Sequence, residues 1–244
     1  MCEVEFTRHP FEIIVNDDSF IIPVGNAGNI SALGKGLREL FDLGISVLTT
    51  GNHIWDKKDV LEYIQNESRL IRPANYPEDT PGRGSTIVTT GSGHKVAVLN
   101  LSGRIFMDPL DCPFKTAEKE IELLREETNL IFVDFHAEAT AEKLAAGWFL
   151  DGKVSALLGS HTHVQTADER ILPNGTAYIS DAGMTGSFNS VIGMDKDISI
   201  ERFRTQMPVS YRVAKGDLAL NGVFVEADAD SGKAINIERV QLGE

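Results

Sequence analysis

The sequence predicts an α/β protein in which a mixed sheet, or two packed sheets, is buried between helices. Apolar runs rich in β-branched residues alternate with amphipathic helical patterns along the chain, and both crossovers and a hairpin connect them. The chain has 244 residues, a length suited to one well-buried domain. The sequence shows no internal repeat and no low-complexity linker, so we interpret residues 1–244 as a single domain.

Individual elements follow from the same patterns. Residues 85–90 and 95–101 flank the sequence Gly-Ser-Gly, which predicts a β-hairpin. The helix expected to begin at Thr140 uses that residue as its N-cap and carries Lys143 on its solvent side. The other strands are predicted at 45–50, 130–135, 154–159, 176–180, 209–213, 219–227 and 234–242, and the helices at 57–65, 116–127, 140–149 and 198–206.

The bulk composition excludes several classes of protein. Hydrophobic residues make up 42% and charged residues 24%, as in globular proteins. A net charge of −13 argues against a surface for duplex nucleic acid. No apolar run approaches the roughly 18 residues needed to cross a bilayer, and the N-terminus lacks the pattern of a secretion signal. With two cysteines, Cys2 and Cys112, and no disulfide framework, we expect a cytoplasmic protein without membrane contact.

Polar side chains follow three of the predicted strands. The strand at 45–50 leads into Asn52 and His53, the strand at 130–135 into His136, and the strand at 154–159 into His161 and His163. In layered α/β folds, ligands bind outside the carboxyl ends of the strands. Imidazole is the commonest transition-metal ligand, and together with amide oxygen it suits Mn, Fe or Zn better than Ca or Mg. The pattern therefore predicts a transition-metal site.

Each of these features has a simpler interpretation when taken alone. A single buried histidine is more often a hydrogen-bonded core residue than a ligand, and Asn-His after a glycine is also a common turn. The occurrence of Asn or His residues after three separate strands is what favours a metal site over these simpler interpretations. In an extended segment His161 and His163 would point the same way, whereas in a turn they would diverge and reach two adjacent metals. His9 and His94 are interpreted as structural.

The motifs around these residues resemble the calcineurin-like metallophosphoesterases, and more closely the YmdB-type cyclic-nucleotide phosphodiesterases. A Gly-Asn-His sequence is followed by a strand-end histidine and then by Gly-x-His-x-His, as in those enzymes. The similarity runs from about Leu37 to the C-terminus. It is most specific in Thr50–Lys58, Arg72–Pro77, Asp134–Thr140, Gly159–Asp168 and Asp181–Gly186.

The resemblance implies a four-layer α/β/β/α sandwich with two divalent transition metals, Fe or Mn or else Zn. Asn52, His136 and His161 would hold one metal, and His163 would help to hold the other. His53 would protonate the leaving alcohol. The implied substrates are cyclic nucleotides such as 2′,3′-cyclic monophosphates, hydrolysed through attack by a metal-activated hydroxide. A homo-oligomer is compatible with these expectations.

The first 36 residues depart from the family, which gives the sandwich an atypical, shortened N-terminus. Family members open with strands that end in Gly-Asp and Asn-Gly-Glu-Asn, and neither motif is present here in standard form. Three interpretations are open: Asp17 or Asp18 replaces the missing carboxylate, the chain keeps only one metal, or the N-terminus is a damaged or artificially joined version of the family's start. The alternative function is therefore a metal-binding regulatory or scaffold protein with little or no turnover.

Overall fold

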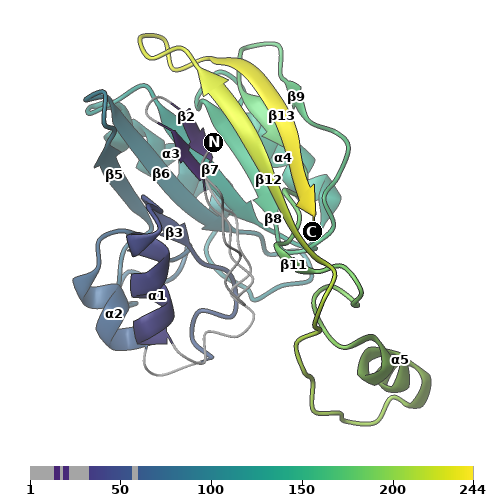
Figure 1. Ribbon diagram of the computed structural model, residues 1–244. Helices are drawn as coiled ribbons and strands as arrows, with labels where there is room; N and C mark the ends of the chain where they lie inside the picture. Colours follow the sequence, from purple (N-terminus) through teal and green to yellow (C-terminus); the bar gives the residue numbers. More distant parts are fainter. Residues whose placement is uncertain (1–13, 17–18, 22–32, 57–59, 244) are drawn as a thin grey trace.

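Two β-sheets packed against each other form the centre of the molecule in the computed structural model (Figure 1). The structure describes residues 14–16, 19–21, 33–56 and 60–243. The six-stranded sheet consists, in spatial order, of β5 (Ser85–Thr89), β6 (Lys95–Ser102), β7 (Ile131–His136), β8 (Ala156–Ser160), β10 (Ala177–Ile179) and β9 (Arg170–Ile171). The five-stranded sheet consists of β1 (Ile14–Asn16), β2 (Ser19–Ile21), β12 (Leu218–Ala227) and β11 (Gly186–Ser187), with β13 (Ala234–Gly243) also paired to β12.

The middle of the six-stranded sheet is parallel. Strands β6, β7, β8 and β10 run in one direction, and β5 and β9 pair antiparallel at its edges. Strands β7 and β8 are buried along their whole length, which explains their almost continuous apolar sequences. The register places Ser102, His136 and Ser160 beside one another at the carboxyl end of the sheet. This is the end at which parallel α/β sheets bind ligands.

Apolar side chains fill the space between the two sheets. Val98 and Phe132 from the six-stranded sheet pack with Val223 and Val225 from β12 in one buried cluster. Strand side chains alternate between faces, so a second set points to the opposite side of the six-stranded sheet. The predicted α/β class, with two packed sheets, is confirmed.

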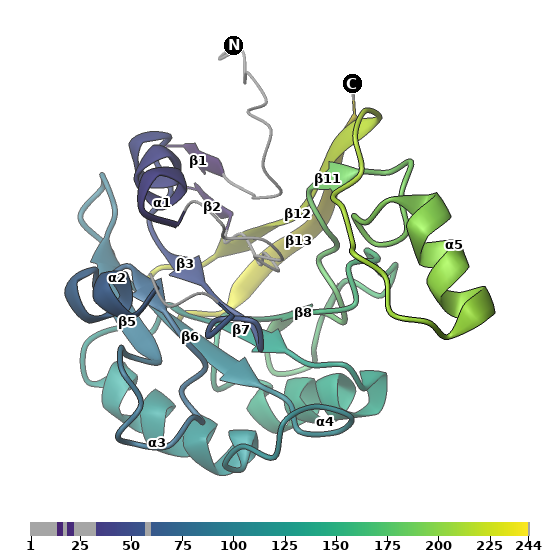
Figure 2. The same cartoon turned by 90° about the horizontal axis from the view of Figure 1, so that it is seen from below.

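Helices α3 (Pro113–Arg125) and α4 (Thr140–Leu150) cover that opposite side. They pack on it through a buried cluster that includes Phe135 and Tyr178. Figure 2 shows the resulting order of helices, six-stranded sheet and second sheet. Helices α3 and α4, the six-stranded sheet and the second sheet therefore form three successive layers of the predicted sandwich.

Two further helices lie beside this stack. Helices α1 (Leu33–Asp42) and α2 (Val60–Asn66) share a third apolar cluster with the short parallel strands β3 (Leu48–Thr49) and β4 (Leu70–Ile71). The cluster includes Ile64, which is 2% exposed. These elements support the turn that follows β3, from which two of the predicted site residues project.

The last helix, α5 (Lys196–Thr205), belongs to an arm of residues 188–217 that projects away from both sheets (Figure 1). Asp195 caps it, because its side chain accepts hydrogen bonds from two backbone N–H groups of the first turn. The strand predicted at 209–213 is wrong, since the segment forms only an isolated bridge between Val213 and Met194. The arm carries residues 209–213 away from the sheets (Figure 1).

Two expectations about α4 are also wrong. Thr140 is its first helical residue, and Ala139 occupies the N-cap position without a side-chain cap. Lys143 does not face solvent: its side chain is 2% exposed, and Nζ donates to Asp181 Oδ2 at 2.9 Å. The ion pair offsets part of the free-energy cost of burying the lysine charge. The helical pattern does not reveal such a partner, so it predicts an exposed position for this lysine.

Two short strands near the N-terminus join the second sheet. Strands β1 and β2 are antiparallel, and β2 pairs with β12. Asp17 and Asp18, the proposed replacement ligands, lie outside the described residues, as do Cys2 and His9. Their roles stay predictions. Among the helices of the described ranges, none has the length and apolar character to traverse a bilayer.

Candidate active site

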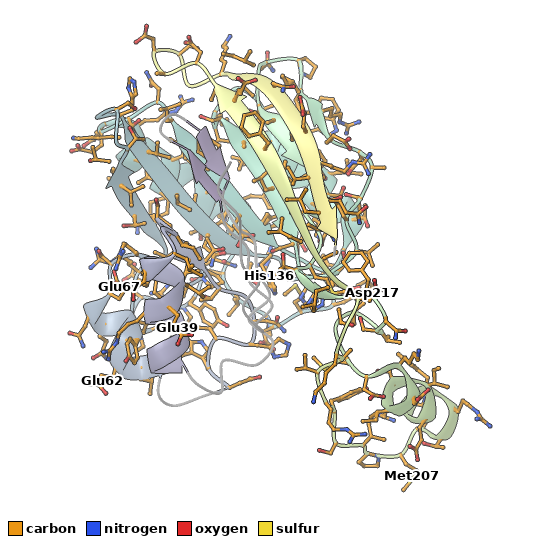
Figure 3. The ribbon with its side chains drawn as sticks, in the orientation of Figure 1. Glu39, Glu62, Glu67, His136, Met207 and Asp217 are labelled. Carbon is orange, nitrogen blue, oxygen red and sulfur yellow. The ribbon has the colours of Figure 1, made fainter. Side chains whose placement is uncertain are left out.

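Three segments meet at the carboxyl end of the six-stranded sheet. Asn52 lies in the turn after β3, His136 is the last residue of β7, and His161 directly follows β8. Figure 3 labels His136 at the lower end of the sheets. The side chain of His136 contacts Asn52 and His161 across 84 and 25 positions of sequence. The structure therefore brings together one residue from each of the three predicted strand ends.

Three atoms able to bind a cation converge here. Asn52 Oδ1 lies 2.9 Å from His136 Nε2, and His161 Nδ1 lies 3.0 Å from that same nitrogen. The two imidazole planes are inclined at 76°, with ring centroids 4.7 Å apart. Two ligand atoms at right angles, each about 2.1 Å from a metal, are separated by about 3.0 Å. The observed spacings fit ligands of one transition-metal ion.

Hydrogen bonds behind His136 determine which of its nitrogens carries the proton. Ser160 Oγ donates its single proton to Asp134 Oδ1 at 2.9 Å. The hydroxyl can then only accept from His136 Nδ1, which lies 3.1 Å away. A neutral His136 therefore keeps its proton on Nδ1 and presents the electron pair of Nε2 to Asn52 and His161.

Glu138 fixes His161 in the opposite sense. Its Oε2 lies 3.1 Å from His161 Nε2, and a carboxylate only accepts, so the proton of a neutral His161 is on Nε2. The electron pair of His161 Nδ1 then faces that of His136 Nε2, with the amide oxygen of Asn52 beside them. These electron pairs repel one another, and a cation between them would turn the repulsion into attraction.

Burial favours the neutral form of both imidazoles. The pKa of His136 lies well below its ordinary value, first because the ring is buried and second because of the nearby charge of His161. The pKa of His161 is also lowered, because burial outweighs the opposing charge of Glu138. Burial raises the pKa of Asp134 to about 7. Neutral imidazole is the form that binds metal, so the site is electrostatically prepared for it.

The composition of the cluster differs from a histidine–carboxylate site. In the part of the chain that the structure describes, no three His, Cys, Asp or Glu side chains gather around one point. The converging atoms are instead two imidazole nitrogens and one amide oxygen. Catalytic metals commonly have three protein ligands and an open position. Asn52, His136 and His161 can supply such a set.

His163 faces a different part of the site. Its Nδ1 donates to the backbone carbonyl of Ile192, on the projecting arm, at 2.9 Å. His161 and His163 have φ angles of 98° and 68°, so the segment is a turn and the two side chains diverge, as the second of the two expected geometries requires. With its proton on Nδ1, a neutral His163 has Nε2 as the atom that can bind a metal.

His53 lies on the exposed side of the cluster. Its side chain is 49% exposed, and Nδ1 lies 3.1 Å from Asp56 Oδ2. The carboxylate only accepts, so it keeps a proton on Nδ1 and leaves Nε2 to exchange a proton with a substrate. The charge of His53 contributes to the lowered pKa of His136, which places the two rings within electrostatic range.

Gly51→Ala is expected to weaken metal binding while leaving the fold intact. A Cβ at Gly51 would lie 2.3 Å from His136 Cε1 and 2.4 Å from its Nε2, so the ring would have to move. We expect the Mn affinity of the apo-protein, measured by calorimetry, to fall about tenfold or more, as when groups that orient a metal ligand are lost. Gly91→Ala is the control, because a Cβ there meets nothing within 4 Å. Equal affinities in the two variants would contradict a ligand role for His136.

Sequence reasoning missed most of the residues behind the histidines. The sequence patterns do not predict Ser160, Asp134 or the buried pair of Lys143 with Asp181 as partners of the site. One signal could have revealed the first two. Asp134 interrupts an otherwise apolar strand, and a buried carboxylate requires hydrogen-bond partners.

Comparison with known proteins shows the family to which the chain belongs. A family model described as YmdB-like protein matches residues 14–240. The chain belongs to the YmdB-like family. A 2′,3′-cyclic-nucleotide 2′-phosphodiesterase of Bacillus subtilis is 50% identical to it over 222 residues, which cover 89% of this chain and 84% of that relative. The family resemblance inferred from the sequence is thereby confirmed.

Solved structures show the same architecture as this YmdB-like chain. A hypothetical protein from Thermus thermophilus superposes with a TM-score of 0.81 at 38% identity, covering 86% of this chain and 81% of the other. A phosphatase from Mycoplasma pneumoniae superposes with a TM-score of 0.79 at 37% identity, covering 86% and 76%. The fold is therefore the calcineurin-like sandwich, and the YmdB-like chain is a metallophosphoesterase by class.

Proposed function

We propose that this YmdB-like chain is a metal-dependent phosphodiesterase that hydrolyses cyclic nucleotides such as 2′,3′-cyclic monophosphates. The observation that carries the proposal is the convergence of two imidazole nitrogens and one amide oxygen, at spacings of 2.9 and 3.0 Å. The Bacillus subtilis relative is named for that substrate class. The named relatives support an enzyme over the regulatory or scaffold alternative.

In the proposed enzyme, Asn52, His136 and His161 hold one metal and His163 contributes to a second. Iron or manganese, or else zinc, suits this mixture of nitrogen and oxygen ligands. When bound, the metals supply Lewis acidity that neutralises charge on the phosphoryl oxygens and lowers the pKa of water. The chain's own task is to turn the three imidazoles correctly, which their outer hydrogen bonds and ion pair accomplish, while burial favours the neutral form of His136 and His161.

His53 is the proposed proton donor to the leaving ribose oxygen. Its exposure lets Nε2 meet a substrate, while the hydrogen bond from Nδ1 to Asp56 restricts the orientation of the ring. As the bond between phosphorus and the ribose oxygen breaks, the imidazolium gives up its Nε2 proton to that oxygen and becomes neutral. A hydroxyl group then leaves in place of a high-energy alkoxide.

The number of metals depends on the N-terminal segment. In two-metal sites the ions lie about 3.5–4 Å apart, and a bridging carboxylate offsets their repulsion. Asp17 or Asp18 would have to supply it here. We expect that without such a carboxylate the site anchored by His163 is the weaker of the two. Turnover would then fall below that of an intact two-metal enzyme.

Calorimetric titration of the apo-protein with Mn, combined with hydrolysis of 2′,3′-cyclic AMP, tests the proposal. One tight site with slow turnover is expected. Two tight sites with brisk hydrolysis would instead assign Asp17 or Asp18 as the replacement ligand. Metal binding without hydrolysis of either the cyclic nucleotide or bis-p-nitrophenyl phosphate would favour the scaffold alternative, and no metal binding would refute the proposal.

A reducing cytoplasmic setting is part of the same proposal. Within the described residues, Cys112 is a free thiol of intermediate exposure, which suits a compartment that keeps thiols reduced. The small nucleotide substrate is the partner that the proposed reaction requires. Self-association of the chain stays a prediction.

A further inference from the structure

The turn that carries His161 and His163 has a strained backbone. Both residues have φ angles in the left-handed region, 98° and 68°, which side-chain-bearing residues rarely adopt. Such conformations persist only where surrounding contacts determine them, and they cluster at functional sites. Something next to the turn must therefore hold it in place.

Asp181 makes the contacts that do this. Its Oδ2 accepts from the backbone N–H of Thr162 at 3.0 Å and from the Thr162 hydroxyl at 2.7 Å. Its Oδ1 accepts from the backbone N–H of Gly183 at 2.9 Å. Thr162 is the residue between the two histidines, so one carboxylate fixes both the backbone and the side chain at the centre of the turn.

Lys143 completes this arrangement from the other side. It reaches from α4, and its Nζ donates to Asp181 Oδ2 at 2.9 Å, with the two side chains 2% and 1% exposed. A buried charged group requires a partner, and Lys143 supplies one to Asp181. The carboxylate that bonds the turn is therefore itself anchored to α4.

We propose that Lys143 and Asp181 are positioning residues that set the His161-Thr162-His163 turn for metal binding. The side chain of Asp181 bonds Thr162, Gly183 and Lys143, so the direct link from the pair to the turn runs through Thr162. The inference rests on the proposed function, because it treats the two histidines as metal ligands. Its rival is that the pair only fills the core. Buried ion pairs often contribute little to stability compared with apolar residues of the same volume, so a role in stability alone does not explain the pair.

Four variants separate the two readings. Asp181→Asn removes the charge, and Lys143→Met removes its partner. Thr162→Val removes only the hydroxyl donor, with little change of volume, whereas Thr162→Ser keeps the donor. Glu169→Gln is the control for loss of one carboxylate charge, because Glu169 forms a more exposed ion pair with Arg239, at 2.7 Å, elsewhere in the molecule.

The first readout is the affinity of each apo-protein for Mn by calorimetry. We expect about a 10- to 100-fold loss for Asp181→Asn and Lys143→Met, the usual effect of removing a group that orients a metal ligand. Thr162→Val should show a smaller loss, and Thr162→Ser and Glu169→Gln should bind like the parent. The second readout is hydrogen exchange of the Thr162 amide without metal, which should quicken in Asp181→Asn while the amides of β7 and β8 stay protected.

The outcomes are distinguishable. A parent protein that binds no Mn would refute the proposed function, and the exchange measurement would still test whether Asp181 holds the turn. A parent that binds Mn, with Asp181→Asn binding equally well, would overturn the positioning role. If Asp181→Asn fails to fold, Thr162→Val and Thr162→Ser carry the test: equal Mn affinities in these two folded variants would overturn the proposal.

Discussion

Replacing both His136 and His161 with alanine is expected to remove the bound transition metal and, with it, all measurable phosphodiesterase turnover. The double variant keeps only the amide oxygen of Asn52 from the converging set, and a single neutral oxygen cannot hold a transition-metal ion against water. Elemental analysis of the purified protein measures the effect directly. We expect the parent to carry Mn, Fe or Zn and the variant to carry none.

A histidine outside the site provides the matched control. His94 is exposed, and its backbone N–H bonds Thr90 Oγ1 next to the hairpin turn between β5 and β6. His94→Ala should therefore retain the parent's metal content. Retention of metal by the His136→Ala/His161→Ala protein would show that the ion binds elsewhere and would refute the assignment of the metal site.

His53→Ala is expected to lower turnover by roughly two to four orders of magnitude, the usual contribution of a general acid. Metal content should be nearly unchanged, because the His53 side chain hydrogen-bonds Asp56 and is not one of the three converging ligands. Steady-state hydrolysis of 2′,3′-cyclic AMP, measured on protein of known metal content, gives the result.

The same variant can also decide between two roles. Loss of metal in His53→Ala would make His53 a ligand and end its role as proton donor. Asp56→Asn offers a milder companion, since an amide can still accept from Nδ1 through its oxygen while losing the charge. We expect its turnover to fall less than that of His53→Ala.

The general position of the site could be predicted because the topology of a parallel sheet brings the carboxyl ends of its strands to one edge. Parallel strands place their carboxyl ends on one edge, so polar residues after β7 and β8 had to lie close together. The hairpin of β5 and β6 was equally predictable from its alternation and its glycine-rich turn. Both inferences depend on periodicity and register, which are properties of local sequence.

Other features depend on contacts that local sequence does not contain. Lys143 has the sequence setting of a surface residue, and only its contact with Asp181, 38 positions away, explains its burial. The residues at 209–213 alternate as in a strand, but the arm carries them away from both sheets. The short strands β9 and β11, two residues each, are too brief for any periodic signal.

The distance along the chain between the site residues determines when the site can form. Asn52 and His136 touch across 84 positions, and His136 and His161 across a further 25. Closing such loops costs entropy before any contact is made, so these pairings form late in folding. A nascent chain has no complete site until the segment after β8 has been synthesised. A metal that binds only the finished fold cannot guide its early steps, and its stabilisation would appear almost wholly as slower unfolding.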